Sequence, residues 1–200
     1  MLVIGLTGPT GAGKGTVGAI FSEHSIPVID ADAVYHELLV PPSPCLDALK
    51  ERFGEQILLP DGSLHRKKLG EIVFSDPEAL KDLNKIAHGF VMAEIRRRLE
   101  ELRSKNLPAA VMDAPQLFEA NAQRDCNLIV SVLADKRIRL ERIMARDGID
   151  ADAALRRIEA QKNDDFFRTH SDYIVENNGN PDLLKPQIER ILLETGVLSP

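Results

Sequence analysis

A glycine-rich segment near the N-terminus follows an apolar run and carries one lysine. Residues 8–16 read GPTGAGKGT, and residues 2–6 read LVIGL, the composition of a short buried strand. Glycines allow positive φ angles, so successive backbone N–H groups can point inward at phosphate oxygens. A helix that begins behind them adds the positive end of its dipole, and Lys14 adds a mobile ammonium for the β- and γ-phosphates. Strand, loop and helix together predict a nucleotide-phosphate site.

The loop departs from the usual phosphate-loop pattern at one position. That pattern has Ser or Thr directly after the lysine, where the hydroxyl ligates Mg²⁺. Here that position is Gly15, and the hydroxyl comes one residue later. The GKGT ending resembles adenylate-kinase-like nucleotide kinases, which implies that Thr16 contacts phosphate and that the metal is held largely through water. The loop residues that we expect to bind ATP are Gly11, Ala12, Gly13, Lys14, Gly15 and Thr16.

Three aspartates follow two other apolar runs. The segments are VIDAD at residues 28–32 and VMDAP at residues 111–115. Ligands of doubly wound sheets bind at the carboxyl ends of the strands. There, Asp30 and Asp32 could orient or deprotonate an attacking hydroxyl, or hold hydrated Mg²⁺. Asp32 could also cap the next helix. Asp113 closes its strand as a Walker-B residue does, and we expect it to contact Mg²⁺ or its waters.

Arginines recur at helical spacing in the second half of the chain. Arg139, Arg142 and Arg146 fall on one face of a predicted helix that ends at Asp147-Gly148. A second arginine-bearing helix follows, capped by Asp150. Two such helices joined at a glycine turn resemble a lid that closes over phosphates. The alternative is a solvated arginine face that pairs with Glu141 and Glu159.

These residues need a scaffold, and the order of apolar runs predicts one. Strand-like runs cover residues 2–6, 26–29, 109–112, 128–133 and 173–175, with helical patterns between them. Most of the runs are continuous rather than alternating, as in strands covered on both faces. We therefore predict a doubly wound α/β fold with a parallel sheet. A final helix is expected over residues 181–195 and has a packing role.

Two stretches break the simple alternation. Residues 33–107 make no convincing strand, and their patterns predict a helical insertion between the second and third strands, where a kinase would bind its acceptor. Residues 136–170 form the predicted lid region. The core is then assembled from residues 1–32, 108–135 and 171–200.

Composition excludes several classes of function. The net charge of −6 and the pI near 5.4 argue against nucleic-acid binding. Cys45 and Cys126 lie far apart and suggest neither a disulfide framework nor a zinc site. No histidine pair has metal-ligand spacing, and no nucleophile elbow occurs. The sequence begins directly with the first strand, so we expect no signal peptide, no membrane span and a cytoplasmic location.

Taken together, these segments resemble the dephospho-CoA kinase family over nearly the whole chain. The resemblance lies in the phosphate loop, VIDAD at 28–32, RFG at 52–54, DGSL at 61–64, RKKL at 66–69, IVFSDP at 72–77, His88, DAP at 113–115, LFE at 117–119, RIMARDG at 142–148, RIEAQ at 157–161 and DYIVENNG at 172–179. It implies a P-loop kinase with a three-layer α/β/α core and a five-stranded parallel sheet, a helical acceptor-binding insertion and a helical lid. It also implies phosphorylation of the ribose 3′-hydroxyl of dephospho-CoA by ATP with Mg²⁺, the last step of coenzyme A synthesis.

The resemblance implies roles for single residues. The catalytic residues are Lys14, which binds the ATP phosphates, Asp32, which positions or deprotonates the acceptor hydroxyl, and Arg142, which stabilises charge on the transferring group and, with Arg146, binds ATP. Metal contacts fall to Asp113 and Asp30, through water. The residues expected to bind the acceptor are Asp32, His36, Arg66, His88, Phe118 and Glu119. The chain departs from the usual family residues at Gly15, His36, Gly89, Gln116 and Phe167.

Two other functions stay open from the sequence. One is a kinase of the same architecture with a nucleoside or nucleoside monophosphate as its acceptor. The other is a nucleotide-binding protein that regulates without phosphorylating a small molecule. The three aspartates at positions 30, 32 and 113 favour an enzyme.

Overall fold

Five strands form one sheet in the computed structural model, which describes residues 1–199. The strands are β1 (Leu2–Thr7), β2 (Val28–Asp30), β3 (Ala109–Asp113), β4 (Leu128–Leu133) and β5 (Tyr173–Glu176). Each lies on one of the predicted apolar runs, so the α/β prediction is confirmed. The run at residues 26–29 begins two residues too early, because Ile26 and Pro27 form an irregular segment between the turn at His24–Ser25 and β2.

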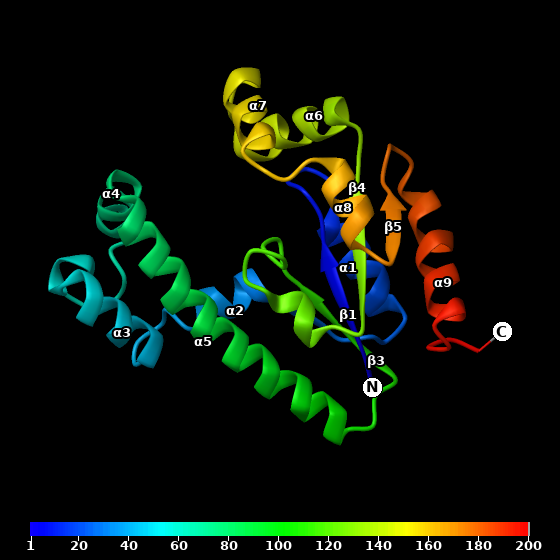
Figure 1. The fold of residues 1–200 in the computed structure, drawn as a ribbon, viewed down its shortest axis with the longest axis horizontal. Helices are drawn as coiled ribbons and strands as arrows, with labels where there is room; N and C mark the ends of the chain where they lie inside the picture. Colours follow the sequence, from blue (N-terminus) through cyan, green and yellow to red (C-terminus); the bar gives the residue numbers. More distant parts are fainter. Residues whose placement is uncertain (200) are drawn as a thin grey trace. The chain divides into compact units, whose positions relative to one another are not determined.

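The strand order is β2-β3-β1-β4-β5, which places β1 at the centre of the sheet (Figure 1). β1 pairs in parallel with β3 and β4, and β4 pairs in parallel with β5. β3 lies on one side of β1 and β4 lies on the other, so the strands that follow β1 in the sequence are placed on both sides of it. In open parallel sheets, such a reversal of strand order opens a crevice at the carboxyl ends of the strands. The glycine-rich loop directly follows β1.

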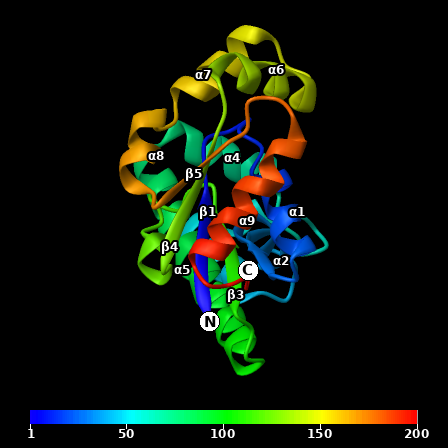
Figure 2. The ribbon, with the colours of Figure 1, turned by 90° about the vertical axis from the view of Figure 1, so that its right-hand side faces the viewer.

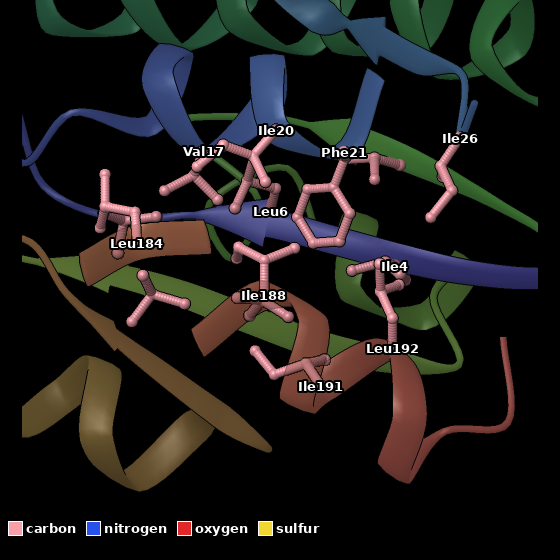
Figure 3. Close-up of a cluster of buried hydrophobic side chains, with 14 of the residues drawn as sticks. Ile4, Leu6, Val17, Ile20, Phe21, Ile26, Leu184, Ile188, Ile191 and Leu192 are labelled. Carbon is pink, nitrogen blue, oxygen red and sulfur yellow. The ribbon is translucent and has the colours of Figure 1, made fainter. Parts of the chain in front are cut away.

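Helices α1 (Lys14–Glu23) and α9 (Leu184–Glu194) pack on one face of the sheet (Figure 2). Ile4 and Leu6 point toward them, because alternate residues of a strand face the same side. Phe21 of α1 and Leu192 of α9 complete this core, and both side chains are fully buried (Figure 3). Gly5 faces the other side, where a Cβ would come within 2.8 Å of the Cys126 sulfur.

The other helical segments between residues 122 and 170 lie elsewhere around the sheet. A 3₁₀ turn, η2 (Ala122–Asp125), precedes β4, and α8 (Asp164–His170) packs on β4. Helices α6 (Lys136–Asp147) and α7 (Ala151–Glu159) pack together beyond the carboxyl ends of the strands (Figure 2). The predicted turn at Gly148 and the predicted cap at Asp150 are confirmed.

One helix boundary was predicted wrongly. The final helix begins at Leu184 rather than at Pro181, because residues Pro181–Leu183 form a separate 3₁₀ turn, η3. Asn180 caps that turn by accepting a hydrogen bond from the Asp182 N–H. Proline at the first position suits either helix type, so the sequence pattern does not separate the two.

The chain divides into two compact units: residues 1–29 with 101–200, and residues 30–100. The second unit holds α2 (Ala31–Glu37), α3 (Pro44–Phe53), the 3₁₀ turn η1 (Glu55–Ile57), α4 (Arg66–Ser75) and most of α5 (Pro77–Ser104). Its own core contains Leu49, Phe53 and Ile57 together with Leu69 and Val73. The segment between β2 and β3 is therefore helical, as predicted.

None of the helices in residues 1–199 combines the length and the apolar character needed to cross a bilayer.

A charged cluster within the second unit ties α5 to α2. Glu94 accepts hydrogen bonds from Arg97 at 2.7 Å and from Arg98 at 2.8 Å, and Arg98 also pairs with Glu37. The Glu94 side chain is only 20% exposed. These bonds lower the pKa of Glu94 from 4.5 to about 2. A carboxylate with a lowered pKa stabilises the folded state above the pKa that it has in the unfolded chain.

We expect Glu94→Gln to lower the free energy of unfolding at pH 7 by about 2 kcal/mol. The difference from the parent chain should narrow as the pH falls from 4.5 toward 2, since Glu94 is then protonated in the unfolded parent chain while it stays ionised in the folded one. Urea unfolding at several pH values between 7 and 3 measures it. Glu78→Gln is the control on the same helix, because Glu78 is exposed and pairs loosely with Lys81. If the difference in the free energy of unfolding between Glu94→Gln and the parent chain does not change with pH, the lowered pKa of Glu94 is contradicted.

Candidate active site

The loop between β1 and α1 is shaped to receive an anion. Gly13 is the N-cap of α1 at φ +93°, and no side chain within residues 1–199 caps that helix end. The first N–H groups of a helix without such a cap, here those of Lys14 and Gly15, are open to an anionic ligand, whereas the Thr16 N–H donates to the Gly13 carbonyl at 3.1 Å. Gly11 also has a positive φ of +78°. A Cβ on Gly8 would lie 2.3 Å from the Val132 carbonyl oxygen, so the loop needs glycine there to fit against β4.

Lys14 and Asp113 meet beneath this loop. The Lys14 Nζ lies 3.0 Å from Asp113 Oδ1, and both side chains are largely buried. Lys14 is the first residue of α1 and Asp113 is the last residue of β3, so the central strand pair brings them together. Gly15 and Thr16 are exposed on the first turn of α1. This arrangement combines a cation, a helix N-terminus and a carboxylate, as phosphoryl transfer requires.

The outward side of the loop is bound by side chains from elsewhere in the chain. Arg142 donates from Nη1 to the carbonyl oxygens of Gly11 and Ala12, both at 3.3 Å, and from Nη2 to Asn177 at 3.2 Å. Asn177 donates to the Ala12 carbonyl at 2.7 Å. Arg142 was predicted at the ATP site, whereas Asn177 was not assigned a role. It is buried directly after β5, and its position after a strand is the signal that could have found it.

The three arginines predicted to share one face of α6, at positions 139, 142 and 146, have different partners. Arg139 is buried and bonds to the Thr10 carbonyl and to Asp164. Burial lowers the pKa of the Arg139 guanidinium, and Asp164 partly opposes that effect. Arg146 makes two hydrogen bonds to Asp147, and these raise its pKa. The alternative pairing of these arginines with Glu141 and Glu159 is wrong. Those two glutamates pair with Arg137 and Lys136.

Asp30 and Asp32 lie at the start of the second unit. Asp30 is the N-cap of α2, because its Oδ1 accepts hydrogen bonds from the N–H groups of Asp32 and Ala33 at 2.8 and 3.1 Å. The idea that Asp32 caps this helix is therefore wrong. Asp32 sits in the first turn with an exposed side chain. The Asp32 carboxylate takes no part in the cap and is accessible to a ligand, whereas Asp30 uses one carboxylate oxygen for the cap.

The predicted acceptor residues of the second unit include one contacting pair. Arg66 Nη2 lies 2.9 Å from His36 Nδ1. Since a guanidinium can only donate, Nδ1 must be the acceptor, which leaves the proton of the neutral imidazole on Nε2. Burial raises the pKa of the neighbouring Tyr35, and Arg66 partly opposes that rise. His88 is half-buried on α5, and Gly89 beside it is exposed.

Phe118 belongs to an aromatic cluster of the first unit. Its ring lies edge-on to Phe166 at 5.1 Å between centroids and close to Phe167, and Phe166 stacks on His170 at 4.2 Å. Phe167 is buried. The cluster joins the segment after β3 to α8, so Phe118 has a packing role whatever else it contacts. Glu119, next to it, is exposed.

Comparisons with known proteins agree with this geometry. The family model described as dephospho-CoA kinase matches residues 2–182. A dephospho-CoA kinase of Symbiobacterium thermophilum is 39% identical over 189 residues, which are 94% of this chain and 79% of that protein. A crystal structure from Thermus thermophilus matches with a TM-score of 0.78 and 31% identity over 96% of this chain and 97% of that one. The dephospho-CoA kinase of Campylobacter jejuni matches with a TM-score of 0.71 and 26% identity over 96% of each chain.

Sequence, sheet order and loop geometry thus point to one group of proteins, and the family model covers nearly the whole chain. This chain belongs to the dephospho-CoA kinase family.

Proposed function

We propose that this chain transfers the γ-phosphoryl group of ATP to the ribose 3′-hydroxyl of dephospho-CoA, which yields coenzyme A. The observation that carries the proposal is the Lys14–Asp113 pair at the uncapped N-terminus of α1. Family membership names the substrates, because the relatives are called dephospho-CoA kinases. The alternatives of a nucleoside or nucleotide kinase and of a non-catalytic binder are weakened by the same match.

On the ATP side, the exposed first turn of α1 and the loop amides would bind the phosphates. Lys14 would turn from Asp113 toward the β- and γ-phosphates, since a flexible ammonium can exchange one anionic partner for another. Arg142 would leave the loop carbonyls and neutralise charge on the transferring group, with Arg146 nearby on the same helix. The gain in rate then comes from alignment and from fixed charges that need no rearrangement.

On the acceptor side, Asp32 would orient the 3′-hydroxyl and accept its proton. Asp32 follows β2 by two residues, and segments that follow parallel strands leave the sheet at its ligand-binding edge. The helical insertion of residues 33–107 would bind the rest of dephospho-CoA, through His36, Arg66 and His88. Phe118 and Glu119 would contribute from the segment after β3. Residues 136–170 would serve as the lid that excludes water.

Mg²⁺ fits the residues that the family implies for it. Asp113 offers a hard oxygen ligand beside the phosphate loop, and Asp30 keeps one carboxylate oxygen beyond its cap. Both would hold the ion through water, with Thr16 on phosphate. When bound, Mg²⁺ would neutralise charge on the β- and γ-phosphates. We infer that the protein works on small molecules rather than nucleic acid, in line with its net charge of −6, and in the cytoplasm.

Mass spectrometry of the acceptor tests the proposal. The chain is incubated with ATP and Mg²⁺, with dephospho-CoA, adenosine, AMP and CMP in separate tubes. We expect dephospho-CoA alone to gain one phosphoryl group, at its 3′ position. Faster conversion of another acceptor would mean that the departures from the usual family residues at His36, Gly89 and Gln116 go with a different acceptor. No product in any tube, with ATP still bound, would favour the non-catalytic reading.

A further inference from the structure

The tip of the phosphate loop is held from both sides at Thr10. The Thr10 N–H donates to Gln161 Oε1 at 2.8 Å, and the Thr10 carbonyl accepts from Arg139 Nε at 3.0 Å. Arg139 lies on α6, and Gln161 lies between α7 and α8. The two peptide groups that flank Thr10 are therefore bonded to segments far along the chain.

Arg139 occupies a place built around this contact. It is only 3% exposed, its Nη1 lies 3.3 Å from Asp164, and its Nη2 has no hydrogen-bond partner within residues 1–199. A Cβ on Gly11 would lie 2.8 Å from the Arg139 carbonyl oxygen, so loop and helix backbones touch. Burying a guanidinium with an unsatisfied donor costs stability, and a hydrophobic residue of similar size would avoid that cost. The position therefore favours a role beyond packing.

The contacts at Thr10 determine where loop amides point. In a trans peptide, the N–H points opposite to the C=O of the same peptide group. Arg139 holds the Thr10 carbonyl, and so it aims the Gly11 N–H to the other side. Gln161 holds the Thr10 N–H, and the carbonyl of that same peptide group, on Pro9, accepts the Ala12 N–H at 3.2 Å. Together they fix the first half of the loop.

We infer that Arg139 and Gln161 are positioning residues for ATP, which act through the two peptide groups of Thr10 to orient the phosphate-binding amides. Because both side chains come from the segment with α6 to α8, the loop reaches its binding geometry only when that segment is in place. Asp164 supports the arrangement by orienting Arg139. The inference rests on the proposed ATP site but does not depend on the identity of the acceptor.

Three variants of the exposed segment and one of the buried arginine test it. Gln161→Leu removes the acceptor oxygen and shortens the side chain by one atom, and Gln161→Glu keeps an oxygen at that place. Ala160→Glu controls for the added charge one residue away, on an exposed position. Arg139→Met removes the guanidinium and keeps much of the volume. The measurements are the KM for ATP, the KM for dephospho-CoA, the Kd of a fluorescent ATP analogue, and the Tm.

We expect Gln161→Leu and Arg139→Met each to raise the KM for ATP and the Kd of the analogue by about tenfold. The KM for dephospho-CoA should stay within twofold, Gln161→Glu should restore most of the ATP affinity, and Ala160→Glu should change little. The inference is overturned if both KM values rise together, or if only the Tm falls, since either marks a general structural role. Unchanged ATP affinity in Gln161→Leu overturns it as well.

The Gln161 variants decide the outcome even if Arg139→Met does not fold, because Gln161 is exposed. The nucleotide Kd needs no acceptor. If the parent chain binds ATP and leaves dephospho-CoA unchanged, the proposed function fails while this inference is still tested.

Discussion

Lys14→Met should reduce kcat/KM by about a thousandfold or more, because it removes the one cation that the phosphate loop itself carries. The ammonium lies 3.0 Å from Asp113 and needs only side-chain rotation to reach a phosphate bound at the start of α1. A coupled kinase assay, with ATP varied at saturating dephospho-CoA, measures kcat/KM for ATP. Lys185→Met is the matched control, since Lys185 is an exposed lysine of the same unit that pairs loosely with Glu23.

The same substitution should also lower the Tm, because it leaves the buried Asp113 carboxylate without its cation. The double variant Lys14→Met/Asp113→Asn separates the two effects. We expect it to regain much of the lost thermal stability while it stays inactive. Recovery of turnover in the double variant, or near-normal turnover in the single one, would remove Lys14 from the mechanism.

The sequence predicted the scaffold well where local signals decide it. Continuous apolar runs place all five strands, and the loop spacing places Lys14 at the start of α1. Local signals could not decide where two neighbouring residues are equally suited to one structural role. Asp30 and Asp32 are both good cap residues, and only the backbone geometry shows that Asp30 accepts the two amide hydrogen bonds.

Partners that are distant in the sequence could not be predicted at all. Helical spacing puts Arg139 and Arg142 on one face, but it does not say which carbonyl each one meets. Arg139 reaches Thr10, and Arg142 reaches Gly11 and Ala12. Asn177 bonds to Ala12 across a separation of 165 residues, so no pattern within a helix or strand contains that contact.

The loop carbonyls explain why these distant residues matter together. The carbonyls of Thr10 and Ala12 are bound by Arg139 of α6 and by Asn177 after β5, two bonds that do not involve Arg142, which we propose moves to the nucleotide. A loop of glycines is flexible, and ordering it when ATP binds would cost conformational entropy. External hydrogen bonds reduce that cost in advance, since the loop is already held before the nucleotide arrives. The loop thus uses the backbone conformations that glycine permits, while external hydrogen bonds hold it in place before ATP binds.

Asp32→Asn should reduce kcat by about a thousandfold and leave the Kd for ATP within twofold. The amide has the shape of the carboxylate but cannot accept the proton of the acceptor hydroxyl. Asp32 makes no side-chain cap, so the helix loses only a favourable charge in its first turn, worth about 0.5 kcal/mol. Asp47→Asn is the matched control, because Asp47 is likewise an exposed aspartate in the first turn of a helix of the same unit.

The two measurements together distinguish the roles that Asp32 can have. A fall in kcat with intact ATP binding places Asp32 on the acceptor side, whereas an equal loss of ATP affinity would make it a metal or structural residue. Dependence on Mg²⁺ adds a second criterion. A metal residue shifts the Mg²⁺ concentration that gives half-maximal rate, and a proton acceptor leaves it unchanged. We expect that concentration to stay constant in Asp32→Asn and to rise in Asp113→Asn, because in our proposal Asp113, and not Asp32, helps to hold the hydrated ion.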